Sequence, residues 1–126
     1  MVAIMRLVLD SDPRLYLVRG YGNGEIVVGE QRIAQPLIIT PKRLLLDWGA
    51  NSIDALADAH LSVLLGLGAE VVLLGAGERQ TFASAAVRAR FRAQRVALEC
   101  MSLGAACRTY NILATEQRPV AAGLFP

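Results

Sequence analysis

Residues that could carry chemistry gather in the second half of this sequence. Gly75-Ala76-Gly77 follows a short apolar run. Glycines at such a turn let the backbone approach a pyrophosphate, and an acidic residue at the end of the next strand, near Glu99 here, would hold a ribose. The third glycine position of that motif falls at Gln80, and the next predicted helix starts too late for it. A simple chain turn is therefore the favoured interpretation, although its exposed amides could still bind an anion.

Polar residues also follow one face of a helix that we expect from about Leu103 to Glu116. Arg108 and Asn111 lie beside its apolar stripe, and Glu116 stands at its exit. Arg108 could bind charge, Asn111 could orient a ligand and Glu116 could move a proton. A structural ion pair of Glu116 with Arg118 or Arg108 is the favoured alternative. The candidate ligand site consists of Gly75, Gly77, Arg108, Asn111 and Glu116.

Arginines concentrate in residues 79–95, where five occur without an acidic residue. Arg88, Arg92 and Arg95 recur at helical spacing and would share one face. A solvated face is the default interpretation, but such a face could also hold phosphates or an acidic protein surface. It offers no aromatic side chains for stacking bases, so nucleic acid binding is disfavoured. The candidate partner-binding residues are Arg88, Arg92, Arg108 and Asn111.

Other catalytic arrangements are weakly supported. Cys107 lies on an apolar helix stripe, and the only histidine, His60, lies on another helix, so a thiol and imidazole pair is not expected. One histidine and two separated cysteines do not supply a tetrahedral metal site. We expect no metal and no cofactor, and we favour a non-enzymatic protein while leaving that question open.

Composition bounds the class of protein. With 126 residues, 54% of them hydrophobic and 19% charged, one core-rich domain is expected over residues 1–126. The net charge of +2 is too small to imply nucleic acid binding. Apolar runs are too short to span a membrane, and neither an export signal nor a disulfide framework is recognisable. We therefore expect a soluble cytoplasmic protein, either monomeric or weakly oligomeric.

The first half predicts β-structure. Residues 15–48 contain short apolar runs separated by turn residues, which indicates an antiparallel hairpin layer. Asn23-Gly24 tolerates positive φ and should join two of these strands in a tight turn. Pro36 and Pro41 bracket a further strand, LIIT, whose ends need no backbone donor.

The second half predicts alternating helices and strands. An amphipathic helix with Ser52 as its N-cap should end at Gly66 or Gly68. Three apolar strands and two helices should follow as a βαβαβ unit with parallel strands. Their expected ranges are strands 71–74, 96–100 and 120–125, and helices from about 82 to 93 and 103 to 116.

The C-terminal stretch CMSLGAACRTYNILATEQRPVAAGLFP resembles the Mth938-like domain family. That family is labelled a domain of unknown function and includes mitochondrial complex I assembly factor 3. The similarity extends over most of the chain, with Gly75-Ala76-Gly77 at the family's GxG turn and Tyr21 and Trp48 at aromatic positions of the N-terminal layer. Its most specific residues are Met101, Ala106, Arg108, Thr109, Tyr110, Asn111, Leu113, Glu116, Arg118 and Val120.

This resemblance implies an α/β fold with three layers, a mixed central sheet flanked by helices, and an extra N-terminal β layer. It also implies, for the mitochondrial relatives, an accessory role in assembling NADH:ubiquinone oxidoreductase without known catalysis. Two positions depart from the family pattern. Gln117 stands where glycine is usual, and Pro119 follows the arginine, so the helix exit is expected to differ locally.

Two functions follow as hypotheses. The first is a non-enzymatic interaction or assembly factor of a prokaryotic cytoplasm, whose partner would be a subunit of a respiratory or membrane complex. The second is a small-molecule or anion-binding protein, or an enzyme, that uses a crevice near Gly75, Gly77, Arg108 and Asn111.

Overall fold

The computed structural model describes residues 4–7 and 13–126. Within these residues the chain forms two sheets. The smaller sheet contains β1 (Met5–Arg6), β2 (Val18–Gly22), β3 (Glu25–Val28) and β4 (Gln31–Ile33), each antiparallel to its neighbour. At the β2–β3 turn, Asn23 and Gly24 have φ angles of 55° and 73°, so the tight turn expected there is confirmed.

The larger sheet has the strand order β6-β5-β9-β7-β8. Its parallel half comprises β7 (Val71–Ala76), β8 (Ala97–Met101) and β9 (Val120–Phe125). Its antiparallel half comprises β5 (Leu37–Thr40), which pairs with β9, and β6 (Arg43–Leu45). The mixed central sheet and the βαβαβ unit are confirmed.

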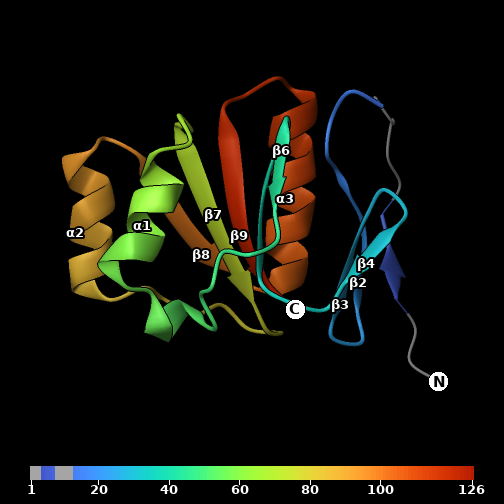
Figure 1. Ribbon diagram of the computed structural model, residues 1–126, viewed down its shortest axis with the longest axis horizontal. Helices are drawn as coiled ribbons and strands as arrows, with labels where there is room; N and C mark the ends of the chain where they lie inside the picture. Colours follow the sequence, from blue (N-terminus) through green and yellow to red (C-terminus); the bar gives the residue numbers. More distant parts are fainter. Residues whose placement is uncertain (1–3, 8–12) are drawn as a thin grey trace.

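Helices occupy both faces of this larger sheet (Figure 1). α1 (Asp58–Leu65) and α2 (Ala85–Ala93) cover one face. α3 (Leu103–Thr115) covers the other face and is itself covered by the smaller sheet. The molecule therefore has two apolar cores, one under α1 and α2 and one around α3, separated by the larger sheet.

The single hairpin layer expected for residues 15–48 is wrong in its second part. β5 and β6 belong to the larger sheet, where every residue of β5 is buried. The run LIIT is apolar at three successive positions, as suits a strand covered on both faces, whereas β3 alternates in burial.

The helix expected from Ser52 is interrupted. Ser52 caps only a 3-10 turn, η1 (Ile53–Ala55), after which Leu56 and Ala57 are extended and α1 begins. α2 begins at Ala85 because the Ser84 side chain accepts a hydrogen bond from the Val87 N–H, so the expected start near Phe82 is too early.

Candidate functional site

Gly75 lies near the end of β7 and Gly77 directly follows the strand, and the two glycines have different structural roles. A Cβ on Gly75 would lie 2.3 Å from the Ala106 Cβ, so glycine there lets α3 pack directly on β7. Gly77 has a φ angle of 65°, and its carbonyl accepts a hydrogen bond from the Leu103 N–H at 2.9 Å. Both positions thus have packing or turn reasons to be glycine, and a ligand role for them stays a prediction.

The segment after Gly77 lacks the arrangement of a dinucleotide site. In such a site the helix follows the glycines directly and presents its N-terminus to the pyrophosphate. Here residues 78–84 intervene before α2, and the Gln80 side-chain amide donates to the Cys100 carbonyl at 3.1 Å. Glu99 is exposed on β8. The dinucleotide interpretation has no structural support.

Arg108 contacts the smaller sheet. Its Nη1 donates a hydrogen bond to the Tyr21 hydroxyl at 3.0 Å. The same hydroxyl would lie 2.4 Å from a Cβ on Gly104, so the Tyr21 ring rests on the first turn of α3. Arg108 itself is exposed. Its guanidinium therefore lies at the outside of the contact between α3 and β2.

The side chain of Asn111 forms hydrogen bonds with the backbone of β2. Its Nδ2 donates to the Val18 carbonyl at 2.8 Å, and its Oδ1 accepts from the Val18 N–H at 2.9 Å. One position earlier on α3, the Tyr110 hydroxyl donates to the Tyr16 carbonyl at 2.7 Å. Asn111 is only 6% exposed, so it cannot orient a ligand at the surface. The sequence signal for its structural role was an amide side chain beside the apolar stripe of the helix, because buried polar groups need hydrogen-bond partners.

Glu116 lies at the opposite end of α3 from Gly77. Gly77 contacts Leu103, the first residue of the helix, whereas Glu116 is its C-cap. The 13 residues between them extend about 20 Å at 1.5 Å per residue. The expected meeting of Gly75, Gly77, Arg108, Asn111 and Glu116 in one crevice is therefore wrong, because a helix of this length separates its two ends. Two surface hollows, of about 440 and 570 Å³, are lined by other residues.

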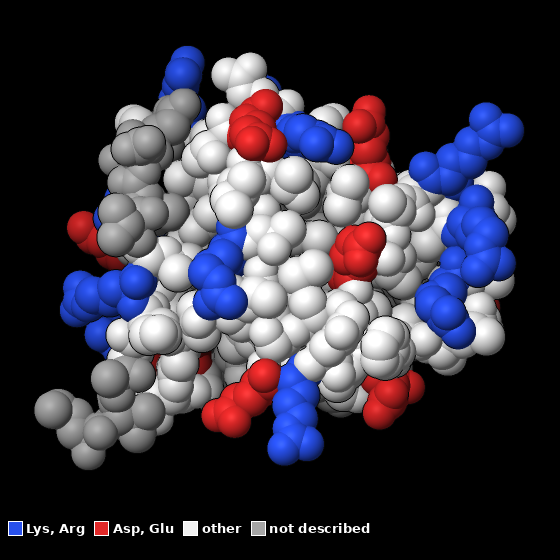
Figure 2. All heavy atoms as spheres, turned by 180° about the vertical axis from the view of Figure 1, so that it is seen from behind, with Lys and Arg blue, Asp and Glu red and all other residues white. Residues whose placement is uncertain are grey.

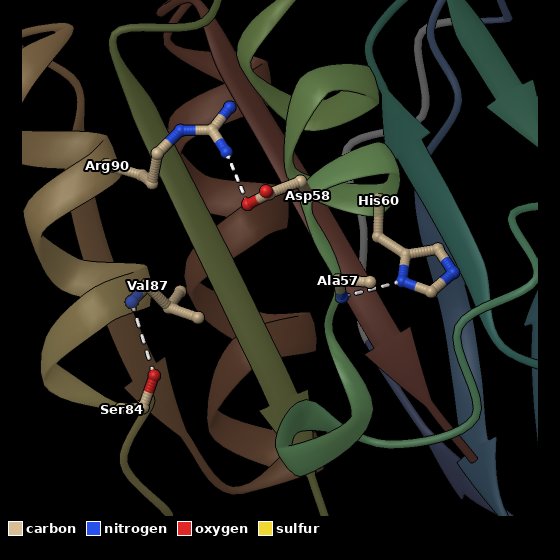
Figure 3. Close-up of polar contacts among 6 residues, drawn as sticks. All are labelled: Ala57, Asp58, His60, Ser84, Val87 and Arg90. Carbon is tan, nitrogen blue, oxygen red and sulfur yellow. Dashed lines mark hydrogen bonds and ion pairs between the residues drawn. The ribbon is translucent and has the colours of Figure 1, made fainter.

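The arginines of α2 divide between its two flanks. Arg90 Nη1 forms an ion pair with Asp58 Oδ1 of α1 at 2.8 Å (Figure 3). Arg88 and Arg92 are exposed on the flank away from α1. Arg95 follows the end of the helix with a φ angle of 58°, so a three-arginine helix face is not formed. Arginine side chains gather at the end of the molecule that α2 occupies (Figure 2).

The cysteine and histidine lie on opposite sides of the larger sheet. Cys107 belongs to the core around α3, and burial raises its thiol pKa to about 12. His60 belongs to α1, where its Nδ1 accepts from the Ala57 N–H at 2.9 Å (Figure 3).

Residues 4–7 and 13–126 contain no cluster of three metal-ligating His, Cys, Asp or Glu side chains. Over the same residues, no helix has the length and apolar character needed to cross a bilayer.

Comparison with known proteins agrees with this fold. A family model described as "Protein of unknown function (DUF498/DUF598)" matches residues 18–125. A solution structure from Xanthomonas campestris is 36% identical with a TM-score of 0.81, and the match covers 94% of this chain and 92% of that one. A Bordetella pertussis protein described as a Mth938-like domain is 27% identical with a TM-score of 0.79, covering 97% and 92% respectively.

Curated relatives carry two kinds of name. NADH dehydrogenase (ubiquinone) 1 alpha subcomplex assembly factor 3 of Xenopus tropicalis is 28% identical, and the match covers 98% of this chain and 67% of that protein. The Danio rerio protein of that name is 32% identical, with 88% and 62% covered. The "13 kDa major membrane protein" of Francisella tularensis is 26% identical, with 79% and 82% covered. The chain belongs to the DUF498/DUF598 family of proteins of unknown function and has the Mth938-like fold.

Proposed function

We propose that this protein is a non-catalytic assembly factor that holds a polypeptide partner from a respiratory complex. The observation that carries the proposal is its similarity to three complex I assembly factors, which match 88%, 92% and 98% of this chain. That similarity includes α3, whose polar residues hold the smaller sheet in place instead of forming a crevice. We also propose that it acts in the cytoplasm.

Arg88 and Arg92 are the contact residues in this proposal. Both are exposed, and among the described residues neither takes part in an ion pair. Arginine side chains can form paired hydrogen bonds to carboxylates, which suits an acidic partner surface. Arg108 is exposed and remains a contact candidate. Asn111 is retained only as a residue that acts on the partner indirectly, by holding β2 against α3.

Affinity purification of the tagged protein from its own cells in mild detergent tests the proposal. We expect enrichment of respiratory-complex subunits with the wild type and its loss with Arg88→Glu/Arg92→Glu. The control is Arg43→Glu/Arg118→Glu, which changes the net charge equally on exposed residues outside α2. Captured subunits should decrease as salt is raised, because salt screens exposed charges. No enrichment above an untagged control, or equal capture by both double variants, would contradict the proposal.

A further inference from the structure

The larger sheet ends in an open edge at β8. In the part of the chain that the structure describes, the edge strands are β1, β4, β6 and β8. The longest of them is β8, with five residues against two or three in the others. Edge strands present unpaired N–H and C=O groups, and proteins commonly protect them with charges, proline or a short length. Between Ala97 and Met101 the only charged residue is Glu99. This edge is thus long enough and regular enough to accept another strand.

The hydrogen bonding of β8 shows which groups point outward. The Ala97 N–H donates to the Glu70 carbonyl at 3.0 Å, so the polar groups of Ala97 point toward β7. Because strand residues alternate, the backbone groups of Leu98 and Cys100 point away from β7. Gln80 already occupies the Cys100 carbonyl. The Leu98 N–H, the Leu98 carbonyl and the Cys100 N–H are therefore the groups that an added strand would bond.

Arg88 and Arg92 lie along this edge. On α2, Val87 and Phe91 face the sheet, and Arg90 points toward α1. At 100° per residue, Arg88 and Arg92 lie on the opposite flank, which extends over the edge beyond β8. The view from behind shows basic side chains gathered where α2 lies (Figure 2).

The environment of the Cys100 thiol places Arg88 next to β8. Burial raises the thiol pKa, a backbone hydrogen bond from Ala83 lowers it, the Glu99 charge raises it and the Arg88 charge lowers it. Arg88 is therefore close to the end of β8. The chain passes from α2 into β8 through residues 94–96, so α2 and β8 run in opposite directions. Arg92 therefore lies nearer than Arg88 to the start of β8.

The spacing of the two arginines matches that of an extended chain. Arg88 and Arg92 are about 6 Å apart along the helix axis, at 1.5 Å per residue. Alternate residues of a strand, which point to the same face, are about 6.6 Å apart. A strand beside β8 would therefore present every second side chain to successive arginines. Phe82, 71% exposed in the segment that contacts Cys100, adds apolar surface at the end of the edge.

We infer that the β8 edge binds an extended segment of a partner protein that carries Asp or Glu at every second position. Main-chain hydrogen bonds to Leu98 and Cys100 provide the attachment, and carboxylates facing Arg88 and Arg92 provide the selectivity. This inference rests on the proposed function and names the chemistry of the partner. A second copy of this chain fits less well, because antiparallel pairing of two β8 strands would bring their arginine flanks together and like charges repel.

Amide hydrogen exchange on the wild-type protein tests the inference directly. The probe is a ten-residue peptide of alternating Asp and Val, and the comparison peptide has Lys in place of Asp. At saturating Asp peptide, exchange at Leu98 and Cys100 should slow at least about tenfold, with Ala97 little changed because it is already bonded. Unchanged exchange at Leu98, or equal protection by the Lys peptide, would overturn the inference.

N-methylated peptides separate strand addition from a purely ionic contact. Methylation of one alternate set of amides should abolish binding, and methylation of the other set should be tolerated because those N–H groups face solvent. Tolerance of both sets would refute strand addition. Arg88→Glu/Arg92→Glu should lower the affinity for the Asp peptide at least about tenfold. Arg43→Glu/Arg118→Glu should lower it by no more than about twofold.

The outcomes also separate this inference from the proposed function. If Arg88 and Arg92 are needed to capture respiratory subunits but the Asp peptide does not protect Leu98, strand addition is wrong and the assembly role stands. If the peptide protects Leu98 but no subunit is captured from cells, strand addition stands and the assembly role is wrong. Protection of Leu98 that grows with protein concentration alone would overturn the inference in favour of a second copy.

Discussion

Gln117 occupies a backbone position that usually favours glycine. It follows the α3 C-cap with a φ angle of 62°, while the Arg118 N–H bonds to the Leu113 carbonyl and the Gln117 N–H to the Ala114 carbonyl. These two bonds form a Schellman motif, so the helix exit keeps the common geometry without glycine. Arg95 ends α2 in the same way, with a φ angle of 58°.

Replacement of Gln117 by glycine should therefore stabilise the protein. A side chain in the left-handed region costs roughly 1 kcal/mol, and relief of that cost should raise Tm by about 3 to 5 °C. Thermal unfolding followed by circular dichroism measures the change. Glu116→Gly is the control, because Glu116 has a φ angle of −81° and gains nothing from glycine. An equal or lower Tm for Gln117→Gly would contradict this explanation.

The buried thiol of Cys107 should make stability depend on pH. Its pKa is about 12 in the folded protein, against an ordinary 9.0, so the unfolded chain loses the proton first. The stabilisation is fully present below about pH 9 and is lost as the pH rises toward 12, by up to about 1.4 kcal/mol per pH unit. Burial also raises the pKa of the Tyr110 hydroxyl, and the loss of stability from its ionisation falls at a higher pH than that from Cys107.

Urea unfolding at pH 8 to 10 checks this expectation against Cys107→Ala. The wild type should lose free energy of unfolding with rising pH more steeply than the variant, because only the wild type has the Cys107 thiol. Parallel pH profiles for the two proteins would show that this thiol titrates alike in the folded and unfolded chains.

At the scale of elements, contact between α3 and β7 depends on a missing side chain. Gly75 is buried, and a Cβ there would meet the Ala106 Cβ at 2.3 Å and the Leu124 Cδ2 at 3.3 Å. The helix therefore lies unusually close to the parallel strands. That close approach positions the start of α3 beside the Gly77 carbonyl.

Gly75→Ala should destabilise the protein by about 2 kcal/mol or more, because α3 must move away from the sheet. Ala106→Gly alone should cost about 1 kcal/mol through helix propensity. The double variant should be more stable than the sum of the single changes predicts, since the colliding methyl group is gone. Denaturant unfolding of all four proteins measures this coupling, and strictly additive changes would argue against the contact as the cause.

At the scale of the whole molecule, α3 joins two sheets that share no strand. One side of α3 packs on β7 and β9. Its other side holds β2 through Asn111 and the segment before β2 through the bond of Tyr110 to Tyr16. The Asn111 amide replaces a neighbouring strand for Val18 by bonding both of its backbone groups. The attachment of the smaller sheet thus depends strongly on one buried side chain.

Asn111→Ala should lower the free energy of unfolding by about 2 to 4 kcal/mol, because it leaves two buried backbone groups of Val18 unpaired. Exchange of the Val18 amide should accelerate more than that of the amides in β7. Arg108→Ala is the control, because its hydrogen bond to Tyr21 is exposed and should contribute little. Unaltered stability of Asn111→Ala would remove its structural role and restore it as a candidate contact residue.

Local patterns in the sequence determined the secondary structure. The Asn23-Gly24 turn, the prolines around β5, and the βαβαβ order are each readable from neighbouring residues, since turn chemistry and apolar periodicity act over a few positions. The break at Leu56 and Ala57 is not readable in the same way, because the apolar spacing continues through it while the backbone becomes extended.

Tertiary structure alone decided what those elements do together. It assigned β5 and β6 to the larger sheet, separated Glu116 from Gly77 by the length of α3, and directed Asn111 to Val18. It also left β8 at the edge of the larger sheet, with the Arg88 charge close to the Cys100 thiol. These relations join residues far apart in the chain, and a hydrogen bond across 93 positions leaves no periodic trace in the sequence.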